Sequence, residues 1–145
     1  MSNYQLPSNI EDHASLVFRN TGTKSFFRFM ANGADCSDTK KIPDEYFVLD
    51  GNSKPLPIAA NKEVAVLWSS LEFRPGIISS CVVVLSFQPK PDVKYISEYK
   101  YEDFGCSASI LRFDESKNMW IGDETVVNRK FRQPFLETGS WCEPK

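Results

Sequence analysis

The stretch SSCVVVLSFQPKPDVKYISEYKYEDFGCSAS, residues 79–109, contains the clearest strand pattern in the chain. Its second half, residues 93–101, alternates in side-chain character: one face carries Val93, Tyr95, Tyr99 and Tyr101, and the other carries Lys94, Glu98 and Lys100. A period of two is typical of a strand with one buried and one exposed face. The first half is an apolar run of strand length, and QPKPD (88–92) marks a turn. The stretch therefore predicts two strands joined by a proline-rich turn.

Short apolar segments between turn signals continue along the rest of the chain. The expected strands are ASLVFR (14–19), SFFRFMA (25–31), EYFVLD (45–50), EVAVLWS (63–69), IISSCVVVLSF (77–87), VKYISEYKY (93–101), SASILRF (107–113), MWI (119–121) and ETVVNRKFR (124–132). The first two, separated by NTGT (20–23), predict a hairpin, and EVAVLWS, apolar on both faces, predicts an interior strand. About eight or nine short strands favour an all-β fold, a mostly antiparallel two-sheet sandwich or, alternatively, a small β-barrel.

Length and charge limit the classes of function. The 145 residues fit one domain, expected over residues 14–145 behind a flexible leader at 1–13. The net charge is −2, and the longest basic run is the pair Lys40–Lys41, so nothing predicts binding to nucleic acid or to an anionic membrane. The leader has no basic start followed by an apolar segment. Taken literally this indicates the cytosol, but an exported protein without its signal would look the same.

Four cysteines at positions 36, 81, 106 and 142 allow several interpretations. None is in a CxxC arrangement and His13 is the single histidine, which disfavours a zinc site. Four reduced, buried thiols in a cytosolic protein remain an alternative. We favour two disulfides in an exported protein, because an even number of cysteines in a small exported domain is typical of such bonds.

Four cysteines permit three connectivities. If residues 79–87, 93–101 and 106–113 formed a plain meander, Cys81 and Cys106 would lie about 9–10 Å apart, two strand spacings, whereas a disulfide needs Cα atoms within about 7 Å. A Cys81–Cys106 bond therefore requires the middle strand to end, bend or change sheet near Tyr101, at EDFG (102–105). We favour this pairing, with Cys36–Cys142 fastening the long loop Asn32–Glu45 to the C-terminal tail.

No arrangement of residues identifies a catalytic site. His13 lies in the expected leader, where no third group holds it against a nucleophile. The adjacent acids are interpreted as solvated turn residues, because neighbouring side chains on an extended chain point to opposite faces: Asp44–Glu45, Glu102–Asp103, Asp114–Glu115 and Asp123–Glu124. No phosphate loop, EF-hand or nucleophile elbow occurs. We expect no enzymatic activity and no cofactor.

Two groups of residues are candidates for a binding surface. Trp68 falls in an apolar strand and is expected in the core, whereas Trp120 and Trp141 are expected to be partly exposed. Exposed tryptophans suit either a glycan or a protein interface. The loop Asn32–Glu45 adds the charged candidates Asp35, Asp38, Lys40 and Lys41.

The segments GADCS (33–37), SSCVVVLSFQPKPDVKY (79–95) and FGCSASILRF (104–113), behind a polar leader, resemble small bacterial envelope lipoproteins with β-sandwich folds. The resemblance covers Ala14 to Phe113 and rests on the spaced cysteines and on Phe87, Pro89 and Tyr95. It implies export, a lipid anchor lost from this chain and a non-enzymatic role, although the lipidated cysteine itself is not present in the sequence.

These observations predict a non-enzymatic module of the bacterial periplasm or cell surface that binds another protein. An immunity protein or an inhibitor of a secreted toxin or hydrolase is the specific expectation. The alternatives are a carbohydrate-binding module and a structural accessory subunit of an envelope complex. Contact with a membrane would require the lost lipid anchor. Reduced cysteines would instead indicate a cytoplasmic protein.

Overall fold

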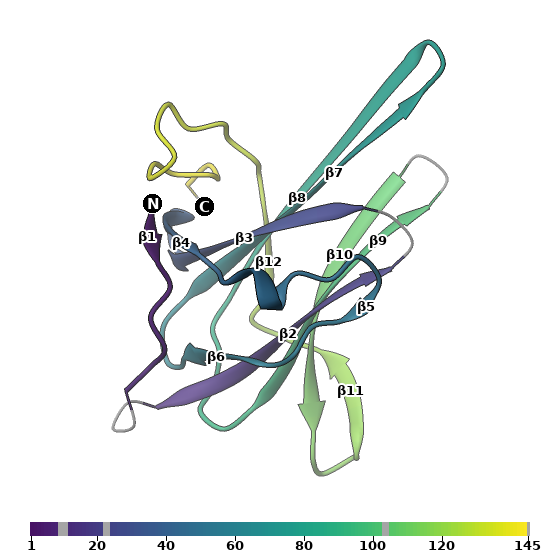
Figure 1. Ribbon diagram of the computed structural model, residues 1–145. Helices are drawn as coiled ribbons and strands as arrows, with labels where there is room; N and C mark the ends of the chain where they lie inside the picture. Colours follow the sequence, from purple (N-terminus) through teal and green to yellow (C-terminus); the bar gives the residue numbers. More distant parts are fainter. Residues whose placement is uncertain (9–11, 22–23, 103–104, 145) are drawn as a thin grey trace.

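The computed structural model describes residues 1–8, 12–21, 24–102 and 105–144, and its fold is an all-β sandwich of two mixed sheets (Figure 1). In the first sheet the strand order is β1-β4-β3-β7-β8-β12, with bounds Ser2–Asn3, Ser37–Lys41, Ser25–Asn32, Val64–Arg74, Ile77–Phe87 and Val127–Arg129. Only β1 and β4 run parallel in this sheet. The expected interior strand is confirmed, because β7 lies between β3 and β8.

The second sheet has the order β11-β10-β9-β2-β5, and β6 also pairs with β2. The bounds are Met119–Gly122, Gly105–Asp114, Lys94–Glu102, His13–Thr21, Gly51–Asn52 and Leu56–Ala59. β2 and β9 pair in parallel, with Val17 opposite Ile96. Among the described strands neither sheet closes on itself, so the sandwich is confirmed and the alternative small barrel is not formed.

Aromatic side chains from both sheets fill the space between them. Phe27 of β3 stacks on Phe18 of β2 with ring centroids 3.8 Å apart. Trp68 of β7 meets the edge of Tyr99 of β9 at 5.4 Å, and its indole Nε1 donates a hydrogen bond of 2.8 Å to Ser97 Oγ. β3 therefore lies over β2, and β7 lies over β9. The expected core position of Trp68 is confirmed, since it is 2% exposed.

Both expected disulfides are present, and Cys81–Cys106 joins β8 of one sheet to β10 of the other. The meander considered from the sequence is wrong, because β8 and β9 belong to different sheets and the chain crosses between them at QPKPD (88–92). Of the three outcomes expected near Tyr101, the strand ends there: β9 stops at Glu102, which pairs with Gly105 of β10 in the same sheet, so the sheet change is not at EDFG. Residues 103 and 104 of EDFG lie outside the described residues.

The expected hairpin of residues 14–31 is also not formed. β2 and β3 lie in opposite sheets and pack face to face, because both carry an apolar face that has to be buried. Between them, residues 22–23 of the expected turn NTGT lie outside the described residues. EYFVLD is not a strand either: Asp44–Tyr46 forms a 3-10 turn, and Tyr46 is buried against the core.

Part of the expected leader packs onto the sandwich. Ser2–Asn3 pairs with β4, Tyr4 lies edge-on against Phe29, and the Tyr4 hydroxyl donates to the Pro57 carbonyl. Burial raises the pKa of the Tyr4 hydroxyl, so this group stays protonated. The strand expected from Ala14 begins at His13, and residues 9–11 of the leader lie outside the described residues.

Candidate functional site

Three of the four charged candidates of the loop Asn32–Glu45, namely Asp38, Lys40 and Lys41, lie on strand β4, and Asp35 lies in the turn before it. Lys40 and Lys41 belong to β4, whose outer side is paired with β1. Asp35 Oδ1 accepts hydrogen bonds from the Ser37 amide and hydroxyl. Asp38 forms an ion pair of 3.1 Å with Lys40, which also donates to Ser2 Oγ. Asp38 and Lys40 thus tie β4 to the N-terminal strand, and Lys40 also lines a pocket there with Tyr4, Phe29 and Lys62.

The expectation that Trp141 is partly exposed is wrong, and the two candidate tryptophans are not brought together. Trp141 is 5% exposed and packs in a second buried cluster on the outer face of the first sheet, with Met30, Ala65, Leu67 and Val84. The Arg28 guanidinium lies 4.4 Å from its ring centroid. Trp120 is 38% exposed and lies on β11 of the other sheet, against Phe113. The structure therefore holds no glycan platform made of both rings.

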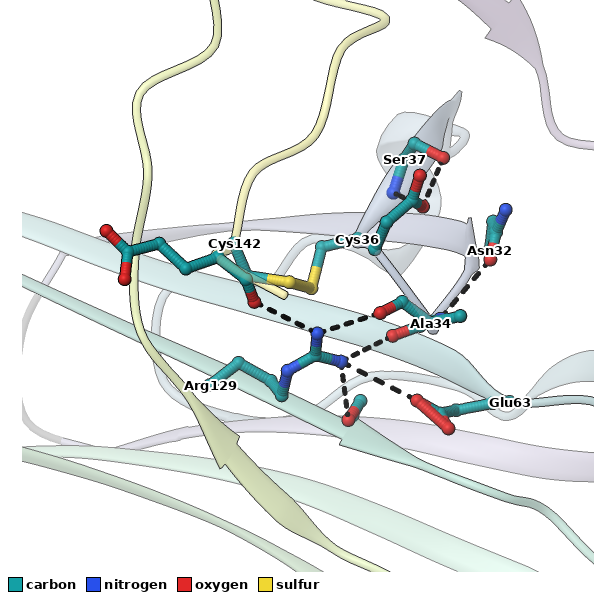
Figure 2. The surroundings of a disulfide bond; sticks show 11 residues. Asn32, Ala34, Cys36, Ser37, Glu63, Arg129 and Cys142 are labelled. Carbon is teal, nitrogen blue, oxygen red and sulfur yellow. Dashed lines mark hydrogen bonds and ion pairs between the residues drawn. A yellow bond between two sulfur atoms is a disulfide. The ribbon is translucent and has the colours of Figure 1, made fainter. Parts of the chain in front are cut away.

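A buried arginine fastens the loop, the C-terminal tail and the Cys36–Cys142 disulfide together (Figure 2). Arg129 of β12 is 5% exposed, and its guanidinium donates to the carbonyls of Gly33 at 2.7 Å, Ala34 at 2.8 Å and Glu143 at 3.1 Å. It also donates to Ser86 Oγ and forms a 3.6 Å ion pair with Glu63. A buried guanidinium with this many acceptors serves to hold the structure rather than to bind a ligand.

Close packing at Gly33 explains the residue type there. A Cβ atom at this position would lie 2.6 Å from the Val64 carbonyl oxygen, closer than real Cβ contacts allow.

The C-terminal tail, which starts after Arg129, crosses the outer face of the first sheet and places Trp141 and Cys142 over it. The chain itself thereby covers the half of that face nearest β12.

The other half of the outer face continues onto a hairpin that projects from the sandwich, which sequence reasoning missed (Figure 1). β7 and β8 pair from Val64–Phe87 to Arg74–Ile77, whereas β3 pairs with β7 only as far as Ser70. We call residues 71–83 the arm. The signal for it was present in the sequence, since Pro75–Gly76 separates two strand-forming segments and Gly76 adopts φ 78° at the turn.

One face of the arm is apolar and exposed. Leu71 is 52% exposed, Phe73 68% and Ile78 71%. Phe73 is paired directly with Ile78, and Leu71 points to the same face because it lies two residues from Phe73. Val82 and Phe26, which are opposite Ser69 on either side of β7, extend this face toward the sandwich. We call these five residues the arm face.

Alternation places Glu72, Arg74 and Ile77 on the other face of the arm, where Ile77 is 54% exposed. Glu72 lies beside Arg74, whose Nε donates to its carboxylate at 2.8 Å. A hydrogen bond from Tyr101, together with that from Arg74, lowers the pKa of Glu72. Ser70 and Tyr99 share a buried hydrogen bond where the arm joins the sandwich. The base of the arm is thus held by polar contacts between the two sheets.

The adjacent acids show no arrangement for acid–base catalysis. Arg112 Nε donates to Glu124 at 2.8 Å, and Lys90 Nζ donates to its other oxygen at 3.1 Å. A hydrogen bond from its own backbone amide, followed by those from Arg112 and Lys90, lowers the pKa of Glu124 to about 2, so it is ionised at neutral pH. Asp123 is 8% exposed rather than solvated and accepts a hydrogen bond from Thr125.

The part of the chain that the structure describes contains neither a cluster of metal-binding side chains nor a membrane-spanning helix. Residues 1–8, 12–21, 24–102 and 105–144 contain no group of three or more His, Cys, Asp or Glu side chains arranged to hold a metal ion. In the same part of the chain, no helix is long and apolar enough to cross a membrane. The arm face is therefore the strongest candidate for a functional surface.

No family model matches the chain, and neither curated proteins nor solved structures match it.

Proposed function

We propose that this protein is a non-enzymatic protein-binding module of the bacterial periplasm or cell surface, and that the arm face contacts its partner. The exposure of large apolar side chains on the arm face carries this proposal. Contiguous exposed apolar side chains on a soluble protein commonly mark a binding surface.

The contrast between the two halves of the outer face supports this assignment. Near β12, the chain covers the sheet with its own tail, and Trp141 and Cys142 are buried there. On the arm, Phe73 and Ile78 remain more than two-thirds exposed. The C-terminal tail thus covers one part of this sheet face, whereas the arm face stays exposed. The arm projects from the sandwich, so a partner reaches it first (Figure 1).

The compartment and the shape of the arm favour the more specific version, an immunity protein or an inhibitor of a secreted toxin or hydrolase. Two disulfides are compatible with an oxidising location outside the cytoplasm. Active sites of hydrolases are concave, and a two-stranded hairpin with an apolar face is narrow enough to enter such a cleft. The partner is thus expected to present an apolar groove.

The test starts from the oxidised protein, immobilised and incubated with secreted and envelope proteins. The protein that it retains is then identified, purified and titrated by calorimetry against three forms: the wild type, the double variant Phe73→Lys with Ile78→Lys, and the control double variant Leu6→Lys with Leu136→Lys. The control positions are exposed to a similar extent, 64% and 65%, outside the arm.

We expect the wild type and the control to bind alike, and the arm variant to bind at least about 100-fold more weakly, because buried interface anchors contribute about 2 kcal/mol or more each. For the inhibitor version, an equimolar amount of wild type abolishes the partner's activity. Equal binding by the arm variant, or retention of glycans without any protein, would overturn the proposal.

A further inference from the structure

We propose that the protein forms a homodimer in which the free edge of β8 pairs, antiparallel, with the same edge of a second copy. Residues Ile77–Val83 of β8 pair with β7 on one side. On the other side β12 pairs only with Val84–Ser86, and no other described strand pairs with β8 there. This inference concerns the edge rather than the arm face, and it does not rest on the proposed function.

The backbone groups on this edge point away from the protein at alternate residues. The Gln88 amide donates to Thr125 Oγ1 at 3.0 Å, on the side where β12 lies. In an antiparallel strand successive residues direct their N–H and C=O groups to opposite sides. Counting back from Gln88, the amides and carbonyls of Ile78, Ser80 and Val82 point to the free edge. These groups are able to pair with another strand without breaking any hydrogen bond between β7 and β8.

The edge has none of the usual protection against pairing. Proteins commonly place lysine, proline or a bulge on an exposed edge strand to prevent association. Residues 77–87 contain no charged residue and no proline, in a chain that is 25% charged. Valine and isoleucine at 77, 78, 82 and 83 also favour the extended conformation. A long, uncharged and unpaired edge is the template that a further strand requires.

The length of the edge fits a second copy of the same strand. Placing Ser80 opposite Ser80 of the second copy pairs Ile77 with the other Val83. The turn Pro75–Gly76 of the second copy then arrives beside Val84, where β12 begins to pair. The paired span Ile77–Val83 therefore ends one residue before Val84, where Arg129 of β12 pairs, and the incoming turn has to bend away from the edge at that point to leave β12 in place. A two-fold axis through Ser80 gives a closed dimer.

The second sheet is open on the same side. β11 pairs with β10 only over Leu111–Asp114, and no other described strand pairs with Gly105–Ser109 on that side. The Cys81–Cys106 disulfide holds this uncharged edge next to β8, one residue from Ser80. A two-fold axis perpendicular to the sheets brings both edges toward their counterparts, so that both sheets continue across the dimer.

Sedimentation equilibrium over a wide concentration range tests the dimer. We expect the oxidised wild type to pass from a mass of 16.5 kDa to twice that mass in the micromolar range. Ser80→Ala, which keeps the backbone amide, should dimerise like the wild type. Ser80→Pro should be monomeric, because it removes an outward-facing amide and leaves the β7–β8 ladder intact.

A charge exchange tests the register and stays informative if the proline variant does not fold. Like charges directly opposite each other destabilise a strand pair, so Ser80→Lys and Ser80→Glu should each be monomeric. When the two are mixed, opposite charges meet across the axis and a mixed dimer should form.

A wild type that stays monomeric throughout would overturn the dimer, as would Ser80→Lys dimerising like the wild type, or a lysine–glutamate mixture that stays monomeric. A monomeric wild type that still binds its partner through Phe73 and Ile78 would overturn this inference alone and leave the proposed function standing.

Discussion

Cys81 of β8 and Cys106 of β10, with Cα atoms 6.2 Å apart, join the two sheets where the arm leaves the sandwich. The arm face points away from the second sheet, on the outer face of the first sheet, and its large apolar side chains remain exposed there. The disulfide fixes the base of the projecting hairpin on the opposite, inner face, and Ser70 and Tyr99 add a buried hydrogen bond nearby.

Both disulfides should be detectable without structural work. We expect alkylation of the native protein without reductant to add no mass, and alkylation after unfolding and reduction to modify all four cysteines. Any adduct on the native protein would contradict the pairing and the exported location.

The two bonds should differ in their effect on stability. They close sequence separations of 25 and 106 residues. The chain-entropy model gives about 3 kcal/mol for Cys81→Ser with Cys106→Ser and about 4 to 5 kcal/mol for Cys36→Ser with Cys142→Ser. Urea unfolding of each double variant, compared with the wild type, measures both losses. A larger loss for the shorter loop would show that factors other than chain entropy decide the ranking.

Arg129→Met should lower the free energy of unfolding by about 3 kcal/mol, because it leaves the buried carbonyl of Gly33 and the partly buried carbonyls of Ala34 and Glu143 without their donor. Arg132→Met, at an exposed position three residues later, makes the same chemical change outside this network and should be nearly neutral. Urea unfolding compares them. Equal losses in the two variants would contradict a fastening role for Arg129.

Ser97→Ala should cost about 1 to 3 kcal/mol, since the buried indole N–H of Trp68 then has no acceptor in the other sheet. Ser109→Ala, on the neighbouring strand β10, is the matched control and should change the free energy of unfolding by less than about 0.5 kcal/mol. A similar cost for both variants would mean that the hydrogen bond between Trp68 and Ser97 contributes nothing specific.

Glu124 should make stability depend on pH in the acid range. Its pKa of about 2 in the folded protein lies below the ordinary value of 4.5. Its contribution is therefore present above the ordinary value and is lost as the pH falls from about 4.5 to about 2. Wild type and Glu124→Gln should differ most in free energy of unfolding near neutral pH and converge toward the lower limit. A difference that does not depend on pH would refute the assignment.

Acrylamide should quench one tryptophan far more strongly than the other two. Trp68 and Trp141 are 2% and 5% exposed, whereas Trp120 is 38% exposed. Trp120→Phe should therefore remove most of the quenchable fluorescence. If Trp141→Phe does so instead, the tail does not lie on the outer face of the first sheet.

Local sequence patterns predicted several strands correctly but did not predict which strands pair with one another. Alternation in residues 93–101 and the apolar faces of EVAVLWS identified β9 and β7, because strand formation depends on near neighbours in sequence. The hairpin expected for residues 14–31 failed because β2 and β3 each bury a face against the other instead of pairing edge to edge. Neither strand carries a local signal that separates these arrangements.

The predictions for the candidate site also separate into local features, which the sequence indicated, and contacts between distant segments, which it did not. The favoured cysteine pairing is the one that the structure contains, but Trp141 was expected to be partly exposed on its local position alone, directly before Cys142. It is buried because the Cys36–Cys142 bond and Arg129 draw the tail onto the outer face of the first sheet. The arm was missed because Pro75–Gly76 was not recognised as a hairpin turn, and the exposure of Phe73 depends on how far the C-terminal tail reaches over the outer face of the first sheet.

By itself, the sequence determined an all-β chain and its main strands, and it favoured, without deciding, the two disulfides that the structure contains. These properties follow from residue type and short-range periodicity. Only the tertiary structure decided which strands pair, which tryptophan is buried and which part of the outer face stays bare, because burial depends on contacts between segments far apart in the chain. The crossing at residues 88–92 is the clearest case: it sends β9 beneath β7 and leaves the edge of β8 open.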